Sequence, residues 1–295
     1  MTVSRILTLA AATCGALSGC RGGGGSGGTK LTLRYHPPAG AAYHYALEQQ
    51  NSMKLENGPM GAMPAQSLTM HMYFTQLVSG PAQGGTAVTV TFDSTAIESP
   101  GMATGAMQPA LDRMRGIKSA LVYDDRMHVV SATFSGVAGE ASPVTDQMGK
   151  NVKSLAFPLP DDPVGVGDSW TAENDLPLSD QLKPSAPIKS TTKLTVKEIQ
   201  VAGADTAVLL AVETTFPGGP IEFTQAAAGG GVPGATGTMR LSGTLTGEQL
   251  YSLTRGAQLR ATMGGTMRIN VKGGQPGLGE MTIAMKQQTS LQLTR

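Results

Sequence analysis

The sequence predicts an all-β protein, a curved antiparallel sheet or half-barrel made of two repeats and accompanied by two short helices. Three observations support this fold class: apolar and polar residues alternate in many segments, glycine and threonine are abundant, and turn residues recur at short intervals. With 295 residues, 40% of them hydrophobic, the chain can bury one large core or two modest ones.

Four segments show the strand-like alternation most clearly. In chain order they are Leu68, Met70, Met72 and Phe74; Val88, Val90 and Phe92; Met263, Met267, Ile269 and Val271; and Met281, Ile283, Met285, Leu291 and Leu293. Successive side chains of a strand point to opposite faces of the sheet. Each segment is therefore expected to be a half-buried antiparallel strand with one face in water.

Two stretches follow helical spacing instead. Their apolar positions are Met107, Ala110, Leu111 and Met114 in the first, and Val144, Met148, Val152 and Leu155 in the second. Ser142 followed by Pro143 suits the N-cap and first turn of the second stretch. We expect two short helices in the first half of the chain.

Three matches, spaced by about 120 residues, indicate an internal duplication. The glycine and aromatic residue at positions 40 and 43 match those at 167 and 170, residues 86–88 match 206–208, and the turn region 123–129 matches 245–251 around Gly247. The sequence therefore predicts a first β-module over residues 30–157, with the two helices, and a second over residues 158–295.

The joint between these modules carries a distinctive motif. Residues 157–160 read Phe-Pro-Leu-Pro, and after Pro163 and Val164 come Gly167, Asp168, Ser169 and Trp170. We expect the glycine and aspartate to form a turn and Trp170 to begin a strand by anchoring in the core. With the glycine-tyrosine entry at residues 40–45, this motif resembles an uncharacterised family of secreted bacterial lipoproteins. That resemblance implies no activity.

The first twenty residues resemble a bacterial lipoprotein signal peptide. Arg5 precedes an apolar stretch over residues 6–16, and Leu17, Ser18, Gly19 and Cys20 then resemble a lipobox. The resemblance implies cleavage between Gly19 and Cys20 and lipidation of Cys20, whose acyl chains would hold the mature protein on a membrane. Residues 21–29, mostly glycine, are expected to be a flexible tether. Arg21 in place of aspartate favours the outer membrane, facing the periplasm, if the organism is diderm.

Several function classes are disfavoured by composition and residue order. The only cysteines are Cys14 and Cys20, so the mature domain has no thiol for a disulfide or a thiolate metal site. A net charge of +1 and 4% aromatic residues disfavour nucleic acid as a partner. Ser169 lacks a following histidine to act as its base, because all four histidines precede it. We therefore expect no catalytic activity, no cofactor and no metal site.

The favoured function is non-enzymatic binding of lipids or other apolar ligands. The predicted fold resembles the half-barrel of periplasmic lipoprotein carriers, and flexible methionine side chains adapt to acyl chains of varied shape. The candidate ligand-binding residues are Met70, Met72, Met107 and Met114. A structural or interaction lipoprotein with a fully packed core is the alternative, and a ligand-sized cavity would distinguish the two.

Periplasmic copper binding is a third candidate, because Met70, His71 and Met72 are consecutive and thioethers suit Cu(I). On a strand, however, the two methionines face one side and the histidine the other. Core packing is therefore the simpler role for these methionines, and protein partners are not predicted.

Overall fold

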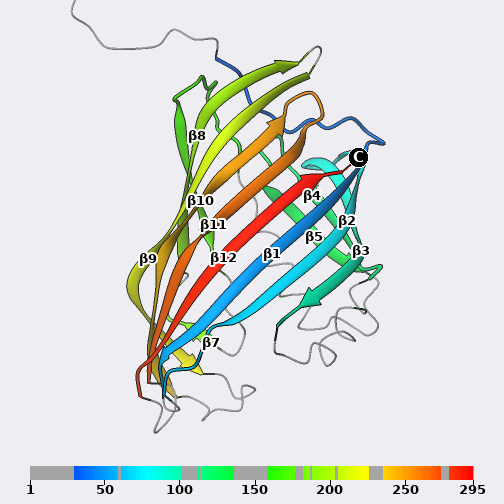
Figure 1. The fold of residues 1–295 in the computed structure, drawn as a ribbon. Coiled ribbons are helices and arrows are strands. Elements are labelled where there is room, and N and C mark those ends of the chain that lie inside the picture. Colours follow the sequence, from blue (N-terminus) through cyan, green and yellow to red (C-terminus); the bar gives the residue numbers. More distant parts are fainter. Residues whose placement is uncertain are drawn as a thin grey trace, which may run out of the picture.

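The computed structural model describes residues 30–58, 61–100, 112, 115–135, 158–176, 182–186, 188–202, 205–225, 235–273 and 279–294. Within them the chain is all-β, as predicted, and forms one large antiparallel sheet that curves without closing (Figure 1). No helix among these residues has the length and apolar character to cross a bilayer. All eight apolar positions on which the two predicted helices rest lie outside the described residues.

Twelve strands of the described residues make up the sheet. They are β1 (Ala42–Asn57), β2 (Gln66–Ala82), β3 (Gly85–Glu98), β4 (Lys118–Tyr123), β5 (Val129–Ser135), β6 (Ser169–Asp175), β7 (Leu182–Pro184), β8 (Lys189–Ala202), β9 (Asp205–Gln225), β10 (Thr236–Ser252), β11 (Ala257–Gly273) and β12 (Met281–Leu293). The order across the sheet is β5-β4-β3-β2-β1-β12-β11-β10-β9-β8-β6, and β7 pairs with β9. The four segments with clear alternation lie in β2, β3, β11 and β12, which confirms them as strands.

The pairing register places the apolar positions of neighbouring strands on one face, called here the inner face. One row across it joins Phe92 of β3, Phe74 of β2, Tyr45 of β1 and Leu293 of β12. The methionines of β1, β12 and β11 make a second row, in which Met285 pairs with both Met53 and Met267. The inner face therefore has two apolar rows, with the polar side chains of Gln49, Asn51, Gln287 and Thr289 between them on β1 and β12.

Glycines allow β10 and β11 to approach unusually closely on this face. A Cβ at position 265 would lie 2.1 Å from the carbonyl oxygen of Thr244, and one at Gly247 would lie 1.8 Å from that of Thr262. Neither distance is possible for a real side chain. Such glycines are a known means of bending a sheet sharply.

The core connects strands that are far apart in the sheet order. Val88 of β3 and Leu194 of β8 belong to one buried cluster, which also includes Leu33, Tyr35 and Leu159 from two connecting segments. Those segments, residues 31–35 and 158–164, pair with each other through the isolated bridge between residues 31 and 164. The two predicted modules thus share one sheet, joined at the β1–β12 pair, and one core.

The joint at residues 158–170 has the predicted turn. Gly167 takes a positive φ of 91°, and the carboxylate of Asp168 accepts a hydrogen bond of 3.0 Å from the backbone N–H of Gly165. Trp170 packs against the core while only partly buried, and its Nε1 donates to the carbonyl of Pro158 at 2.9 Å. The indole therefore fastens the start of β6 to the preceding segment.

One of the matches behind the predicted duplication is wrong. Residues 123–129 contain the turn between β4 and β5, whereas residues 245–251 lie within the continuous strand β10. Gly247 serves close strand approach there and makes no turn. The other two matches have equivalent positions: residues 86–88 and 206–208 begin the long strands β3 and β9, and positive-φ glycines precede β1 and β6. The duplication remains a prediction.

Candidate ligand-binding cavity

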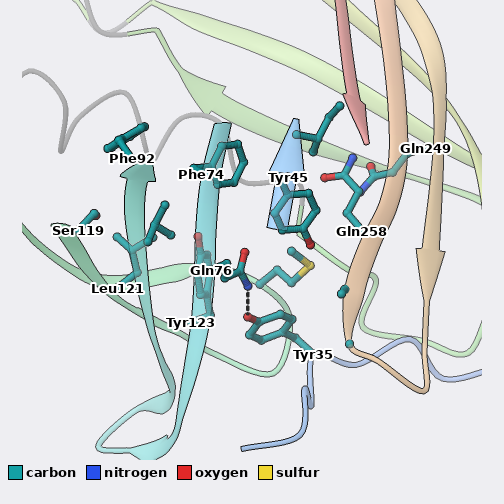
Figure 2. Close-up of a pocket in the computed structure, with 15 residues that line it drawn as sticks. Tyr35, Tyr45, Phe74, Gln76, Phe92, Ser119, Leu121, Tyr123, Gln249 and Gln258 are labelled. Atoms are coloured by element: carbon teal, nitrogen blue, oxygen red, sulfur yellow. Dashed lines mark hydrogen bonds between the residues drawn. The ribbon is translucent and has the colours of Figure 1, made fainter. Parts of the chain in front are cut away.

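A cavity of about 260 Å³ lies on the inner face, beneath the segment that contains Tyr35 (Figure 2). Its walls come from β1–β4, β10, β11 and β12, together with Tyr35, Met127 and Gly256 from outside the strands. Most of the lining is aromatic or aliphatic, which is typical of small-molecule sites. The curvature of the sheet is what brings β4 and β10 to opposite sides of this space.

Two aromatic pairs fix the shape of the walls. Tyr35 meets Tyr123 edge to face, with ring centroids 5.3 Å apart, and Tyr45 stacks on Phe74 at 5.1 Å. Each such pair contributes about 0.5–1.5 kcal/mol beyond the area it buries. Five aromatic residues of a chain that is only 4% aromatic therefore line one space.

The tyrosines of the cavity are uncharged hydroxyl groups near neutral pH. Burial raises the pKa of Tyr123 to about 12, and burial raises the pKa of Tyr35 and of Tyr45 further. Tyr35 is also fixed by a hydrogen bond of 3.2 Å that the side-chain amide of Gln76 donates to its hydroxyl oxygen (Figure 2). These groups can donate or accept hydrogen bonds, but they supply no charge.

Three further polar side chains reach the cavity without a hydrogen-bond partner among the described residues. Ser119 is only 2% exposed, and its Oγ is unsatisfied. Gln249, at 6% exposure, and Gln258 line the opposite side, and neither amide makes a hydrogen bond to a described residue. Buried polar groups are normally paired, because an unpaired one costs about 1–3 kcal/mol.

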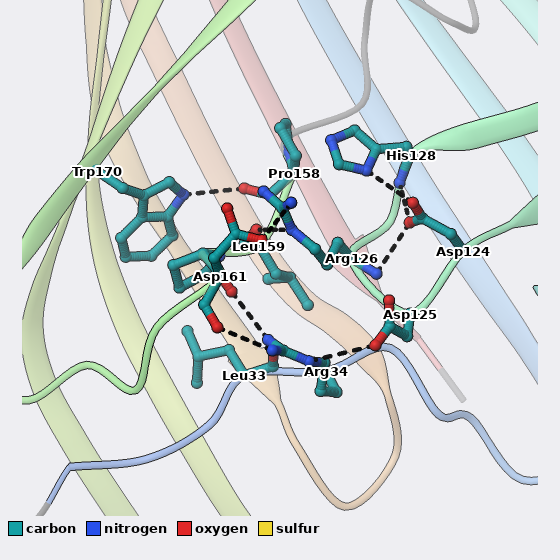
Figure 3. A network of polar contacts seen from close by, with 11 residues as sticks. Leu33, Arg34, Asp124, Asp125, Arg126, His128, Pro158, Leu159, Asp161 and Trp170 are labelled. Atoms are coloured by element: carbon teal, nitrogen blue, oxygen red, sulfur yellow. Dashed lines mark hydrogen bonds and ion pairs between the residues drawn. The ribbon is translucent and has the colours of Figure 1, made fainter.

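The turn between β4 and β5 contributes Met127 to the cavity lining, and Figure 3 shows the polar contacts around this turn. The carboxylate of Asp124 accepts hydrogen bonds from the backbone N–H of Arg126 at 2.9 Å and of His128 at 2.8 Å, and Nδ1 of His128 lies 2.8 Å from its other oxygen. Between them, Met127 takes a φ of 65° and lines the cavity. Asp124 therefore holds a backbone conformation that methionine rarely adopts.

The pKa of Asp124 reflects these contacts. Burial raises it, but the hydrogen bonds from the side chain and backbone of His128 and from the backbone of Arg126 outweigh burial and lower the pKa below its ordinary value. The carboxylate is consequently ionised at neutral pH, in the state that accepts these hydrogen bonds.

Two arginines tie this turn to the connecting segments. Arg126 forms an ion pair with Asp161 and donates from Nε to the carbonyl of Leu159 at 3.1 Å. Arg34 lies 3.3 Å from Asp125 and donates from Nη1 to the carbonyl of Pro160 at 2.8 Å. Exposed ion pairs contribute little singly, about 0–1 kcal/mol, but together they link the β4–β5 turn with segments 31–35 and 158–164 (Figure 3).

None of the candidate residues from the sequence that the structure describes lines this cavity. Met70 and Met72 lie on the inner face of β2, in register with Gln49 and Leu47 of β1, but they do not line the cavity. His71 points to the other face, where its Nδ1 lies 3.8 Å from a carboxylate oxygen of Glu48. Gly19, Cys20, Met107 and Met114 lie outside the described residues.

The residues that line the cavity were not predicted as a site. The scarce aromatics at alternate inner positions, such as Tyr45 and Phe74, were the available signal. No local pattern marks Ser119 or Tyr35, because both reach the cavity only through long-range pairing and packing.

A comparison with protein-family models and with curated proteins found no match to this chain. The resemblance to secreted lipoproteins therefore rests on the motifs at residues 17–20, 40–45 and 157–170 alone.

Proposed function

We propose that this protein is a lipid-anchored lipoprotein of the cell envelope that binds lipids or other apolar ligands without catalysing a reaction. In a diderm organism it would sit on the outer membrane and face the periplasm. The observation that carries the proposal is the cavity of about 260 Å³ on the inner face. Its volume is close to the lower end of the range for ligand sites, about 300–1,000 Å³.

The chemistry of the cavity supports binding over turnover. The described residues that line it include no aspartate, glutamate, lysine, arginine or histidine, so they offer no general base or charged nucleophile. The methionine row, Met53, Met285 and Met267, lies farther along the same face, beyond a polar strip that includes Gln49 and Gln287. A flexible chain that extends past the cavity would meet adaptable thioether side chains there.

The same cavity weakens the alternative of a structural lipoprotein with a fully packed core. The side chains that line this space lack dispersion contacts across it, which lowers stability. Ligand binding gives such a space a role. A protein selected only for a fully packed core would be expected to fill this space with larger side chains.

Binding can be tested with the full chain carrying Cys20→Ala, so that detergent for the acyl chains is unnecessary. We expect it to bind N-phenyl-1-naphthylamine, a neutral fluorescent probe, with saturable enhancement. Val90→Trp places a large side chain in the cavity wall and should abolish saturable binding. Thr89→Trp, on the opposite face of β3, is the matched control and should leave binding intact. Equal binding by both variants would contradict the proposal.

Lipid anchoring is tested separately. Cys20→Ala should remove incorporation of labelled fatty acid and move the protein from the detergent phase to the aqueous phase or to an unprocessed precursor. Ser18→Thr, which keeps the cysteine, is the control. Fatty-acid labelling of Cys20→Ala at the wild-type level would overturn the assignment of the lipidation site.

A further inference from the structure

The polar groups that line the cavity limit the kind of ligand it can hold. Ser119 lies at one side and the pair Gln249 and Gln258 at the other, with the aromatic rings and Gln76 between them (Figure 2). All of these side chains are uncharged, and the charged network of Arg34, Arg126 and Asp124 is not part of the lining.

The unsatisfied groups indicate where a ligand would be recognised. The Ser119 hydroxyl is 2% exposed and unsatisfied, and the Gln249 side chain is 6% exposed and makes no side-chain hydrogen bond to a described residue. A polar group of a ligand inside the cavity would supply a partner to each. A glutamine amide both donates and accepts, so it pairs with an alcohol, an ester or an amide.

An ionised group would be poorly accommodated in the same place. It would lose its hydration and find no opposite charge among the lining residues. The cost applies to both signs, because neither a cation nor an anion lines the cavity.

Resting on the proposed function, we infer that the cavity selects apolar ligands whose polar end is uncharged and hydrogen-bonding, and that it rejects ionised carboxylates and amines of the same chain length. Gln249 and Gln258 are the positioning contacts for that polar end, and Ser119 is the contact on the opposite wall.

The test uses displacement of N-phenyl-1-naphthylamine from the full chain carrying Cys20→Ala, at pH 8. Dodecanol and lauramide should displace the probe, whereas laurate and dodecylamine, with the same number of carbons, should each be at least about tenfold weaker. Gln249→Leu, which keeps the size of the side chain, should reduce affinity for lauramide about tenfold more than it reduces affinity for the probe. Gln258→Leu repeats this test at a less buried position, in case the first variant does not fold.

The outcomes separate the two proposals. Absence of saturable probe binding in the parent protein would refute ligand binding itself. Probe binding together with equal displacement by laurate and dodecanol would refute the selectivity alone. Unchanged lauramide affinity in the folded glutamine variants would refute the assignment of the polar contacts.

Discussion

Because β10 and β11 approach each other closely, we expect alanine substitutions at two adjacent glycines to have opposite effects on stability. Gly264 and Gly265 follow each other in β11, and neither takes the left-handed backbone conformation. A methyl group at position 264 would have its nearest neighbours at 3.4 Å, an ordinary contact. At position 265 it would lie 2.1 Å from the carbonyl oxygen of Thr244, more than an ångström shorter, and that backbone atom cannot rotate away.

Gly265→Ala should therefore destabilise the protein, because relief of the clash requires β10 and β11 to separate. Overpacking of a fixed backbone costs about 1–3 kcal/mol and occasionally more, whereas alanine at position 264 should gain up to about 1 kcal/mol from the reduced entropy of the unfolded chain. The two variants should differ by about 3 kcal/mol, or about 6–12 °C in melting temperature. Thermal unfolding followed by far-UV circular dichroism measures this difference. Coinciding melting temperatures would refute the argument that these glycines permit the bend.

Three more predictions concern the cavity and the joint. The difference in free energy of unfolding between wild type and Asp124→Asn should be constant near neutral pH and shrink as the pH falls below about 3.8. A carboxyl whose pKa is lowered in the folded state stabilises the protein at pH values above its ordinary pKa, and this effect is lost as the carboxyl is protonated. A difference that persists to pH 2 would contradict this. Met127→Gly should relieve about 1 kcal/mol of backbone strain and enlarge the cavity. An alcohol longer than dodecanol should therefore displace the probe at lower concentration from Met127→Gly than from the parent protein. Displacement only at higher concentration would argue that Met127 does not line the binding site. Trp170→Ala should lower the free energy of unfolding by about 3 kcal/mol. Trp170→Phe keeps an aromatic ring but loses the hydrogen bond to Pro158, and should lower the free energy of unfolding by about 1 kcal/mol. Wild-type stability in Trp170→Phe would mean that this hydrogen bond contributes nothing measurable.

The strands could be predicted because their signal is local. Alternation across residues such as Met281, Ile283 and Met285 depends only on neighbours two positions away, and it predicted the strands and the curved sheet. A local pattern also ends where the strand becomes irregular. In β3 the alternation stops at Phe92 because Asp93 is an extra residue in the pairing with β2, which shifts Thr95 onto the inner face.

The cavity could not be predicted because its members meet only after the sheet has formed and curled. Ser119 and Gln249 belong to strands on opposite sides of the sheet order, and Tyr35 precedes the first strand. Methionine abundance indicated an adaptable apolar surface, and Met70 and Met72 do lie on the inner face. Their distance from the lining shows that composition identifies a kind of surface more readily than a position on it.

The pairing of β1 with β12 has a consequence for how this protein acquires its structure during synthesis. Thr294 bonds to the carbonyl of His44, a contact 250 residues apart along the chain. During synthesis β1 can pair with β2 on one side, but its other edge stays unpaired until β12 has been made. Folding of such high contact order is slow, and open strand edges invite intermolecular pairing. A factor that shields the edge of β1 during this interval would raise the yield of folded protein without touching the native state.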